Sequence, residues 1–201
     1  LAESVDPQQA ILLYGNWLLL HKEAAESFAI WFNLGVLYSG QGQHLAASDA
    51  FRETLQLRPH LTEAAINLGT ALEALGQTEA ALGVWKQSLG TKKHWITLQN
   101  QIGRLAENSG RLGEAAEALR NSLLLDHNQP DVVQHLVHIR QRMAVWPPNR
   151  INVPGISELQ AAEQCGPLAA LALFDDPEQQ AGVAAEWIAR KLPKVETLCK
   201  G

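Results

Sequence analysis

The sequence predicts an all-α protein, an α-solenoid of stacked helix-turn-helix repeats, on three observations. Glycines recur in two sets at intervals of 34 residues, and small and bulky apolar residues recur at the same interval. Each half-repeat is apolar on one face at helical spacing, and no segment alternates like a strand. The recurring sets are Gly35, Gly69 and Gly103; Gly42, Gly76 and Gly110; Ala47, Ala81 and Ala115; and Phe51, Trp85 and Leu119. Such a solenoid buries the apolar face of each repeat against its neighbours.

The composition is that of an ordinary folded chain. Its 201 residues are 46% apolar and 18% charged, which supplies ample material for a core. The net charge is −5 without any block of Lys and Arg, so no nucleic-acid partner is expected. The longest clean apolar run, residues 168–174, is well short of the ~20 residues of a membrane span. We therefore expect a cytoplasmic protein with no membrane partner. The chain begins at Leu1 rather than Met, which predicts a fragment of a longer protein.

The interval of 34 residues is the length of the tetratricopeptide repeat (TPR), so the expected solenoid is a right-handed TPR superhelix. The domain prediction is residues 1–27 as N-terminal capping helices or a degenerate repeat, three repeats over 28–61, 62–95 and 96–129, and residues 130–201 as a degenerate repeat helix followed by a helical bridge.

The two glycine sets have different predicted roles. A glycine inside a helix costs about 1 kcal/mol relative to alanine, so its return at one phase predicts a close approach of the two helices in each repeat. The second set follows the first helix of each repeat, where a glycine in the left-handed conformation ends a helix. Pro59 closes the first repeat, whereas Lys93 and His127 stand at its position in the next two.

The N-terminal flank predicts a cap. Asp6 before Pro7 is typical of an N-cap followed by proline at the first helical position. Trp17, Leu18 and Leu20 are expected to cover the open end of the first repeat.

The C-terminal flank predicts four more helices. They run from Pro130 to Met143, from 157 to 164, from 167 to 174, and onward from Pro177. Asp176 caps the last of these, with Gln179 in the capping-box position.

Four tryptophans are expected in helical core positions: Trp31, Trp85, Trp95 and Trp146.

No complete catalytic motif is present, because the chain has no Gly-rich phosphate loop, no G-x-S-x-G elbow and no HExxH sequence. His135 and His138 share a helical face, but zinc requires a third ligand and none is evident. Asp175 and Asp176 would suit a metal or an acid/base pair, yet capping accounts for Asp176. Two cysteines are too few for a disulfide framework. We expect no catalytic residue, no metal and no cofactor in this chain.

A row of polar side chains at one phase of the repeat predicts a binding surface. Asn33, Asn67 and Gln101 each stand two residues before a glycine of the first set, and His135 takes this phase in the degenerate fourth helix. In a TPR solenoid this position faces the concave groove. A primary amide carries both a donor and an acceptor, so it can bind a peptide backbone bidentately without reading its sequence. With first helices stacked roughly 8–10 Å apart, such a row would hold about every third residue of an extended chain.

The predicted groove floor around this row is mixed. Phe32 and Val36 are apolar, whereas Thr70, Asn100 and Arg104 are polar or charged. Such a surface suits broad contact with an extended polypeptide rather than one deep small-molecule pocket. The alternative is structural, with the asparagines bonding the backbone of neighbouring helices. The convex face and the N-terminal face are also available for contact with a second copy, so a homodimer is a further possible partner state.

The repeats resemble a known enzyme family. Asn33-Leu-Gly and Asn67-Leu-Gly inside 34-residue repeats resemble the TPR arm of O-linked N-acetylglucosamine transferases. That resemblance implies a protein-substrate role for both asparagines. Gln101 and His135 depart from the family's asparagine ladder, so the ladder is expected to weaken toward the C-terminal end.

The downstream stretch is similar to the bridge between repeats and catalytic domain in bacterial SPINDLY-like members of that family. The similarity lies in His138-Ile-Arg-Gln-Arg-Met-Ala-Val-Trp-Pro147, in Pro154-Gly-Ile-Ser, and in Pro167-Leu-Ala-Ala-Leu-Ala-Leu-Phe-Asp-Asp-Pro177. The family's two nucleotide-sugar-binding lobes would follow this bridge, so the resemblance assigns no sugar-donor site to residues 1–201.

Two functions follow from these observations. The resemblance implies the acceptor-polypeptide-binding arm of a SPINDLY-like protein O-glycosyltransferase, whose catalytic lobes are absent from this chain. That arm is the main interpretation, and the alternative is a stand-alone TPR adaptor that assembles protein complexes. In both cases the expected partner is an extended polypeptide segment of another protein.

Overall fold

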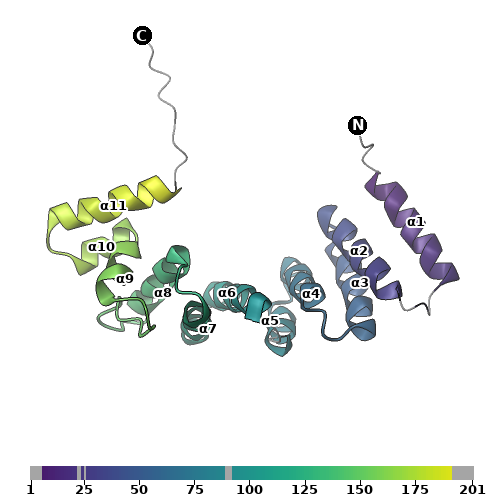
Figure 1. Ribbon diagram of the computed structural model, residues 1–201, viewed down its shortest axis with the longest axis horizontal. Helices are drawn as coiled ribbons and strands as arrows, with labels where there is room; N and C mark the ends of the chain where they lie inside the picture. The colour runs from purple at the N-terminus through teal and green to yellow at the C-terminus, as the bar shows by residue number, and fades with distance from the viewer. Residues whose placement is uncertain (1–5, 22–23, 25, 89–91, 192–201) are drawn as a thin grey trace, which may run out of the picture. The chain divides into compact units, whose positions relative to one another are not determined.

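The computed structural model describes residues 6–21, 24, 26–88 and 92–191. This part of the chain forms eleven α-helices and no strand (Figure 1), which confirms the all-α prediction. The helices are α1 (Pro7–Leu20), α2 (Ser27–Gly40), α3 (His44–Leu57), α4 (Thr62–Ala74), α5 (Thr78–Gln87), α6 (Lys92–Asn108), α7 (Leu112–Leu125), α8 (Pro130–Arg142), α9 (Glu158–Gln164), α10 (Pro167–Leu173) and α11 (Pro177–Lys191). Two compact units comprise Leu1–Leu98 and Gln99–Gly201.

The helices of a pair meet at the glycines of the first set. A Cβ at Gly35 would lie 2.5 Å from Phe51 Cε1, and one at Gly103 would lie 2.5 Å from Leu119 Cδ2. At the equivalent position in α4, a Cβ on Gly69 would overlap the indole of Trp85. The predicted close approach is confirmed, and its cause is now specific: the bulky residue of the second helix lies directly on the glycine of the first.

Each glycine of the second set ends a helix in the left-handed conformation. The φ angles of Gly42, Gly76 and Gly110 are 72°, 74° and 75°. After α2, Gly42 N donates to Ser39 O and Gln43 N donates to Tyr38 O at 2.9 Å, the paired hydrogen bonds of a Schellman motif. The same pair follows α4 and α6. The prediction for this set is therefore confirmed.

The helix α6 begins earlier than the repeat register predicts. Its first residue is Lys92, ahead of residue 96 where the third repeat was expected to begin, and α5 already ends at Gln87. In the first unit α3 continues to Leu57, and Pro59 follows. Lys93 occupies the equivalent position in the next repeat. A proline at this position would disfavour the helical conformation of residue 92, so lysine here allows α6 to begin earlier.

At the N-terminus, α1 packs on α2 as a cap. The side chain of Asp6 accepts from Gln8 N at 3.3 Å, so the predicted N-cap is present. Leu18 is buried with Leu34 of α2, and Trp17 packs at the edge of this cluster. The expectation for Leu20 was wrong, since its side chain is 79% exposed. Leu20 ends α1 and points away from the face that carries Leu18.

The second unit has a continuous apolar core that joins α6, α7 and α8 to the three C-terminal helices. Val137, which replaces the repeat glycine, is fully buried in this core with Ile139 and Cys165. Burial raises the pKa of the Cys165 thiol from 9.0 to about 11. The other cysteine, Cys199, lies outside the described residues.

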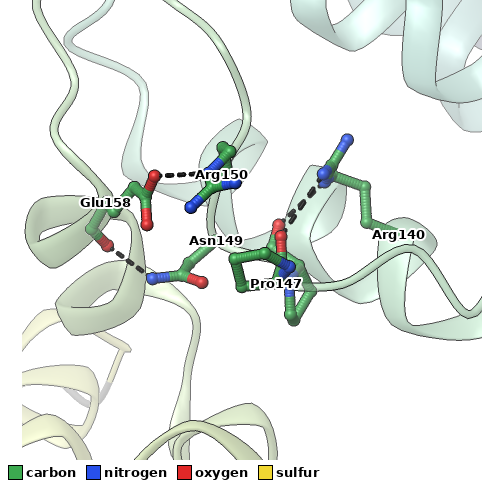
Figure 2. Close-up of polar contacts among 6 residues, drawn as sticks. Arg140, Pro147, Asn149, Arg150 and Glu158 are labelled. Atoms are coloured by element: carbon green, nitrogen blue, oxygen red, sulfur yellow. Dashed lines mark hydrogen bonds and ion pairs between the residues drawn. The ribbon is translucent and has the colours of Figure 1, made fainter.

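The segment after α8 is tied back by side chains (Figure 2). The half-buried guanidinium of Arg140 donates to Pro148 O at 2.9 Å and to Pro147 O at 3.3 Å. Burial and the neighbouring Arg150 lower the pKa of Arg140 from its ordinary value. Asn149 Nδ2 donates to Glu158 O at 2.9 Å, and Arg150 pairs with the Glu158 carboxylate at 2.6 Å. This connector therefore joins α8 to the start of α9 through several bonds.

The tryptophan prediction holds only in part. Trp85 is fully buried, and Trp31 and Trp95 are half-buried. Trp146 is 61% exposed, so its assignment to the core was wrong. It lies beyond the end of α8, at the start of the connector, where none of the described helices covers it as α3, α5 and α7 cover the first helices of their repeats.

The C-terminal helices begin where predicted, but the capping box forms at α9 and not at α11. Asp176 accepts from Glu178 N at 2.9 Å and so caps α11. Within the described residues Gln179 makes no capping-box bond, whereas Ser157 and Gln160 form a full capping box at α9. None of the described helices is both long and apolar enough to span a membrane.

Candidate peptide-binding surface

In the first unit, the predicted amide row lies on α2 and α4, two helices that contact each other. The side chain of Asn33 is exposed and that of Asn67 is half-buried. Each precedes by two residues a glycine that is covered by the second helix of its own repeat. Because Gly35 and Gly69 face α3 and α5, the asparagines one half-turn away lie on the other side of α2 and α4.

The side-chain amides of Asn33 and Asn67 are not used in hydrogen bonds within the described part of the chain. Among the described residues, no hydrogen bond joins the side-chain amide of Asn33 or Asn67 to another group. By contrast, the nearby hydroxyl of Thr70 donates to Ile66 O at 3.0 Å, and Trp85 Nε1 donates to the same carbonyl at 3.2 Å. The structural alternative, in which these amides bond the backbone of neighbouring helices, is therefore not seen in the described part of the chain.

The apolar members of the predicted surface differ in exposure. Val36 is 46% exposed on α2. Phe32 is half-buried, and its ring meets the ring of Phe51 edge-to-face, with centroids 5.8 Å apart. Phe32 thus contributes to the packing of the first repeat while part of its side chain remains accessible.

In the second unit, Gln101 and Arg104 form one pair on α6. The guanidinium donates from Nε and from Nη2 to Gln101 Oε1, at 3.2 Å and 2.9 Å. This arrangement leaves the Gln101 side-chain nitrogen as a donor and fixes the arginine along the helix. At the repeat position where Asn33 and Asn67 have amides without a partner among the described residues, Gln101 therefore has an amide that is bound by arginine.

His135 of α8 is linked to α6 by a polar contact. Its Nδ1 lies 3.3 Å from Glu107 Oε2, and the other carboxylate oxygen lies 3.3 Å from Arg142 Nη1. His138, one turn from His135, does not complete a metal site: the described residues contain no group of three His, Cys, Asp or Glu side chains placed to hold an ion. The cluster is a polar bridge between successive first helices.

A pocket of about 190 Å³ lies beside this bridge, and three of the predicted residues line it. Its lining is Asn100, Arg104, Leu119, Asp131, Val132 and His135. Asn100 Nδ2 donates to Gln129 Oε1 at 2.9 Å, whereas its buried Oδ1 has no partner among the described residues. An unpaired buried acceptor favours an incoming N–H donor, because leaving it unpaired costs about 1–3 kcal/mol.

Sequence reasoning missed the residues that complete this pocket. Val132 and Leu119 supply its apolar walls, and Asp131 its acidic edge. Asp131 also pairs with Lys191 at 2.8 Å, from a helix 60 residues later in the chain. The repeat register carries no signal for such a contact, because α11 lies outside the repeats.

The comparisons with known proteins agree with the fold. The tetratricopeptide-repeat family model matches residues 28–61. A curated relative, the Photosystem I assembly protein Ycf3 of Acaryochloris marina (strain MBIC 11017), is 30% identical over 79 residues, which are 38% of this chain and 48% of Ycf3. The matched stretch thus spans about half the length of that relative.

Two solved structures illustrate the structural similarity. MamA (residues 41 to the end) from Desulfovibrio magneticus RS-1 has a TM-score of 0.60 at 21% identity, over 79% of this chain and 81% of that chain. YrrB, "a TPR protein with an unusual peptide-binding site", has a TM-score of 0.61 at 19% identity, over 92% of this chain and 84% of that chain. These likenesses concern the fold. With the family match over residues 28–61 and the helix pairs, they show that this chain has a TPR-type fold.

Proposed function

We propose that this chain is a TPR adaptor that binds extended polypeptide segments of partner proteins. One observation carries the proposal: the amides of Asn33 and Asn67 stand on contacting helices, and neither has a hydrogen-bond partner among the described residues. Each can accept from a peptide N–H and donate to a peptide C=O. In the second unit, the proposed contacts are Gln101, Arg104 and His135, with the pocket beside them receiving one side chain of the bound segment.

The names of the similar proteins support an adaptor. Ycf3 is named as an assembly protein, and YrrB is described as having a peptide-binding site. Both names describe proteins that act on other polypeptides, which is the class of function that repeats without catalytic motifs predict.

The test is peptide binding by the intact chain. A random 12-residue peptide library would be panned against it, and the selected peptides measured by fluorescence anisotropy. We expect Asn33→Ala with Asn67→Ala to weaken binding about tenfold or more, since two hydrogen-bonding amides are worth roughly 1 kcal/mol each or slightly more. The matched control is Asn16→Ala with Asn121→Ala, which should bind like the wild type. Equal affinity for both double variants would contradict the proposal.

The glycosyltransferase arm is the second candidate, and it rests on the bridge-like sequence at residues 138–147, 154–157 and 167–177. The coding sequence downstream of residue 201 distinguishes the two. Several hundred α/β-type residues there would favour the arm, whereas a stop codon would favour the adaptor. The peptide-binding role of Asn33 and Asn67 is common to both.

A further inference from the structure

A second hollow lies on the three C-terminal helices, apart from the predicted amide row. It encloses about 250 Å³. Its lining residues come from α9, from the end of α10 and from α11: Leu159, Glu163, Phe174, Gln179, Gly182, Val183 and Glu186. They recur at helical spacing on α9 and α11, so one face of each helix borders the hollow. This volume is below the ~300–1,000 Å³ typical of small-molecule pockets, and it fits one bulky side chain.

The hollow has an apolar floor and a glycine where a side chain would fill it. Val183 is buried and Phe174 half-buried, while Leu159 at the rim is 61% exposed. A Cβ placed on Gly182 would meet no atom within 4 Å. Unlike Gly35 or Gly69, this glycine is not required by packing among the described residues. The space above it is open to an apolar group from outside.

The rim of the hollow is acidic. Glu163 and Glu186 are exposed, and neither pairs with a basic side chain among the described residues. From Ser157 to Lys191 the sequence has six acidic and two basic residues. Both basic side chains are turned to another helix, since Arg190 and Lys191 pair with Asp131 of α8 at 3.7 Å and 2.8 Å. The rim therefore presents negative charge without compensation from its own helices.

We propose that this hollow, lined by Leu159, Val183 and Gly182 between Glu163 and Glu186, docks a basic amphipathic helix of a partner protein. One apolar side chain of that helix enters the hollow. Lysine or arginine residues beside it pair with the two glutamates. The site is independent of the adaptor proposal, because it uses none of the residues assigned to the extended-peptide surface.

The chemistry selects this occupant over others. An anionic lipid surface would be repelled by the two glutamates, and an acidic peptide likewise. An extended peptide would be held by side-chain amides, and Gln179 supplies the one side-chain amide among the lining residues. A helix instead presents an apolar anchor flanked by charges at i, i+3 and i+4. The acidic rim thus favours a helix whose apolar stripe is bordered by basic residues.

The probe is an acetylated and amidated peptide of about 18 residues, with leucine on one helical face and lysine elsewhere. A second peptide keeps the leucines and replaces every lysine by glutamate. Binding to the full chain is measured by isothermal titration calorimetry at low and at high salt. We expect the lysine peptide to bind, with an affinity that falls as salt rises, and the glutamate peptide not to bind.

The decisive variant is Gly182→Leu, whose Cβ meets no atom within 4 Å and whose side chain takes up space in the hollow. It should keep the helical circular dichroism and melting temperature of the wild type and weaken lysine-peptide binding about tenfold or more, the equivalent of one lost anchor. Gly182→Ala is the matched control and should retain binding. Asn33→Ala with Asn67→Ala should also leave it unchanged, which separates this site from the amide row.

Charge is tested by Glu163→Gln with Glu186→Gln, which should weaken binding and flatten its salt dependence. Glu26→Gln with Glu117→Gln makes the same change in net charge elsewhere and should have little effect. Equal loss in both double variants would overturn the proposal, since binding would then reflect overall charge. Undiminished binding of the lysine peptide to Gly182→Leu would also overturn the proposal. So would self-association of the wild type in sedimentation experiments that Gly182→Leu abolishes, because the occupant of the hollow would then be a second copy of this chain.

Discussion

Three glycines of this chain are selected by the ring or branched side chain that lies on each of them. Phe51, Trp85 and Leu119 differ in shape, yet each covers the glycine that stands 16 residues before it. The indole of Trp85 is also held by its hydrogen bond to Ile66 O. A ring fixed in this way cannot retreat from a new methyl group. The residue pair, rather than the glycine alone, is the unit that sets the helix spacing.

This contact predicts opposite effects of the same substitution at two glycines. Gly69→Ala should destabilise the protein by roughly 1–3 kcal/mol, because the added Cβ overlaps the Trp85 indole. Gly83→Ala in α5 should stabilise it by about 0.5–1 kcal/mol, since nothing lies near the new methyl and alanine is the better helix former. Urea unfolding of both variants checks this. A Gly69→Ala midpoint at or above that of the wild type would show that the indole yields.

At the scale of elements, the connector between α8 and α9 replaces the short turn that joins the two helices of a repeat. In the repeats a single glycine in the left-handed conformation suffices, as at Gly110 between α6 and α7. After α8 the chain runs through residues 143–157 before α9 begins. Arg140 and Glu158, one from each flanking helix, hold this longer segment through its backbone and side chains (Figure 2).

The two arginines of this region predict unequal losses. Arg140→Ala removes two charge-assisted bonds to Pro147 O and Pro148 O, and should cost about 1.5–3 kcal/mol. Arg150→Ala breaks an ion pair whose side chains are 56% and 50% exposed, and should cost about 1 kcal/mol or less. Hydrogen exchange should quicken across residues 147–156 much more in the first variant than in the second. Equal increases in exchange rate in the two variants would show that Arg140 does not anchor this segment.

At the scale of the whole molecule, the core of the second unit links stability to pH through one thiol. Cys165 is 3% exposed among apolar residues, and its pKa is raised to about 11. The folded protein keeps the thiol proton at a pH where the unfolded chain has released it. The contribution of this group is therefore complete below about pH 9 and is lost as pH rises toward 11.

Cys165→Ala should therefore reduce the loss of stability between about pH 8 and pH 10.5. Urea midpoints of the wild type and the variant at both pH values measure this difference. The comparison concerns the change with pH, because alanine also alters packing at both values. Parallel losses in the two proteins would show that Cys165 does not titrate with unfolding.

Much of the helical pattern could be predicted because it depends on local chemistry. Asp6 and Asp176 are side-chain caps, and the second glycine set ends helices wherever a left-handed residue is needed. Trp146 and Leu20 were misplaced because an apolar residue is buried only if another element covers it. Whether an element covers a residue depends on helices far away in the sequence.

For the candidate site, the repeat phase predicted which side chains share a surface, but the state of each amide had to come from the structure. Asn33 and Gln101 have the same phase, yet only Gln101 is bound by an arginine one turn away. The hollow between α9 and α11 had no signal in the sequence, since Gly182 differs from the packing glycines only in what lies opposite it.

The sequence by itself determined that this protein is a TPR-type solenoid, because a repeat interval records the packing that every repeat must satisfy. It also determined where most helices begin and end, since caps and left-handed glycines act within a few residues. Only the tertiary structure decided which polar groups remain unpaired and where hollows lie. Those properties depend on side chains brought together from distant segments, such as Asp131 with Lys191 and Asn100 with Gln129.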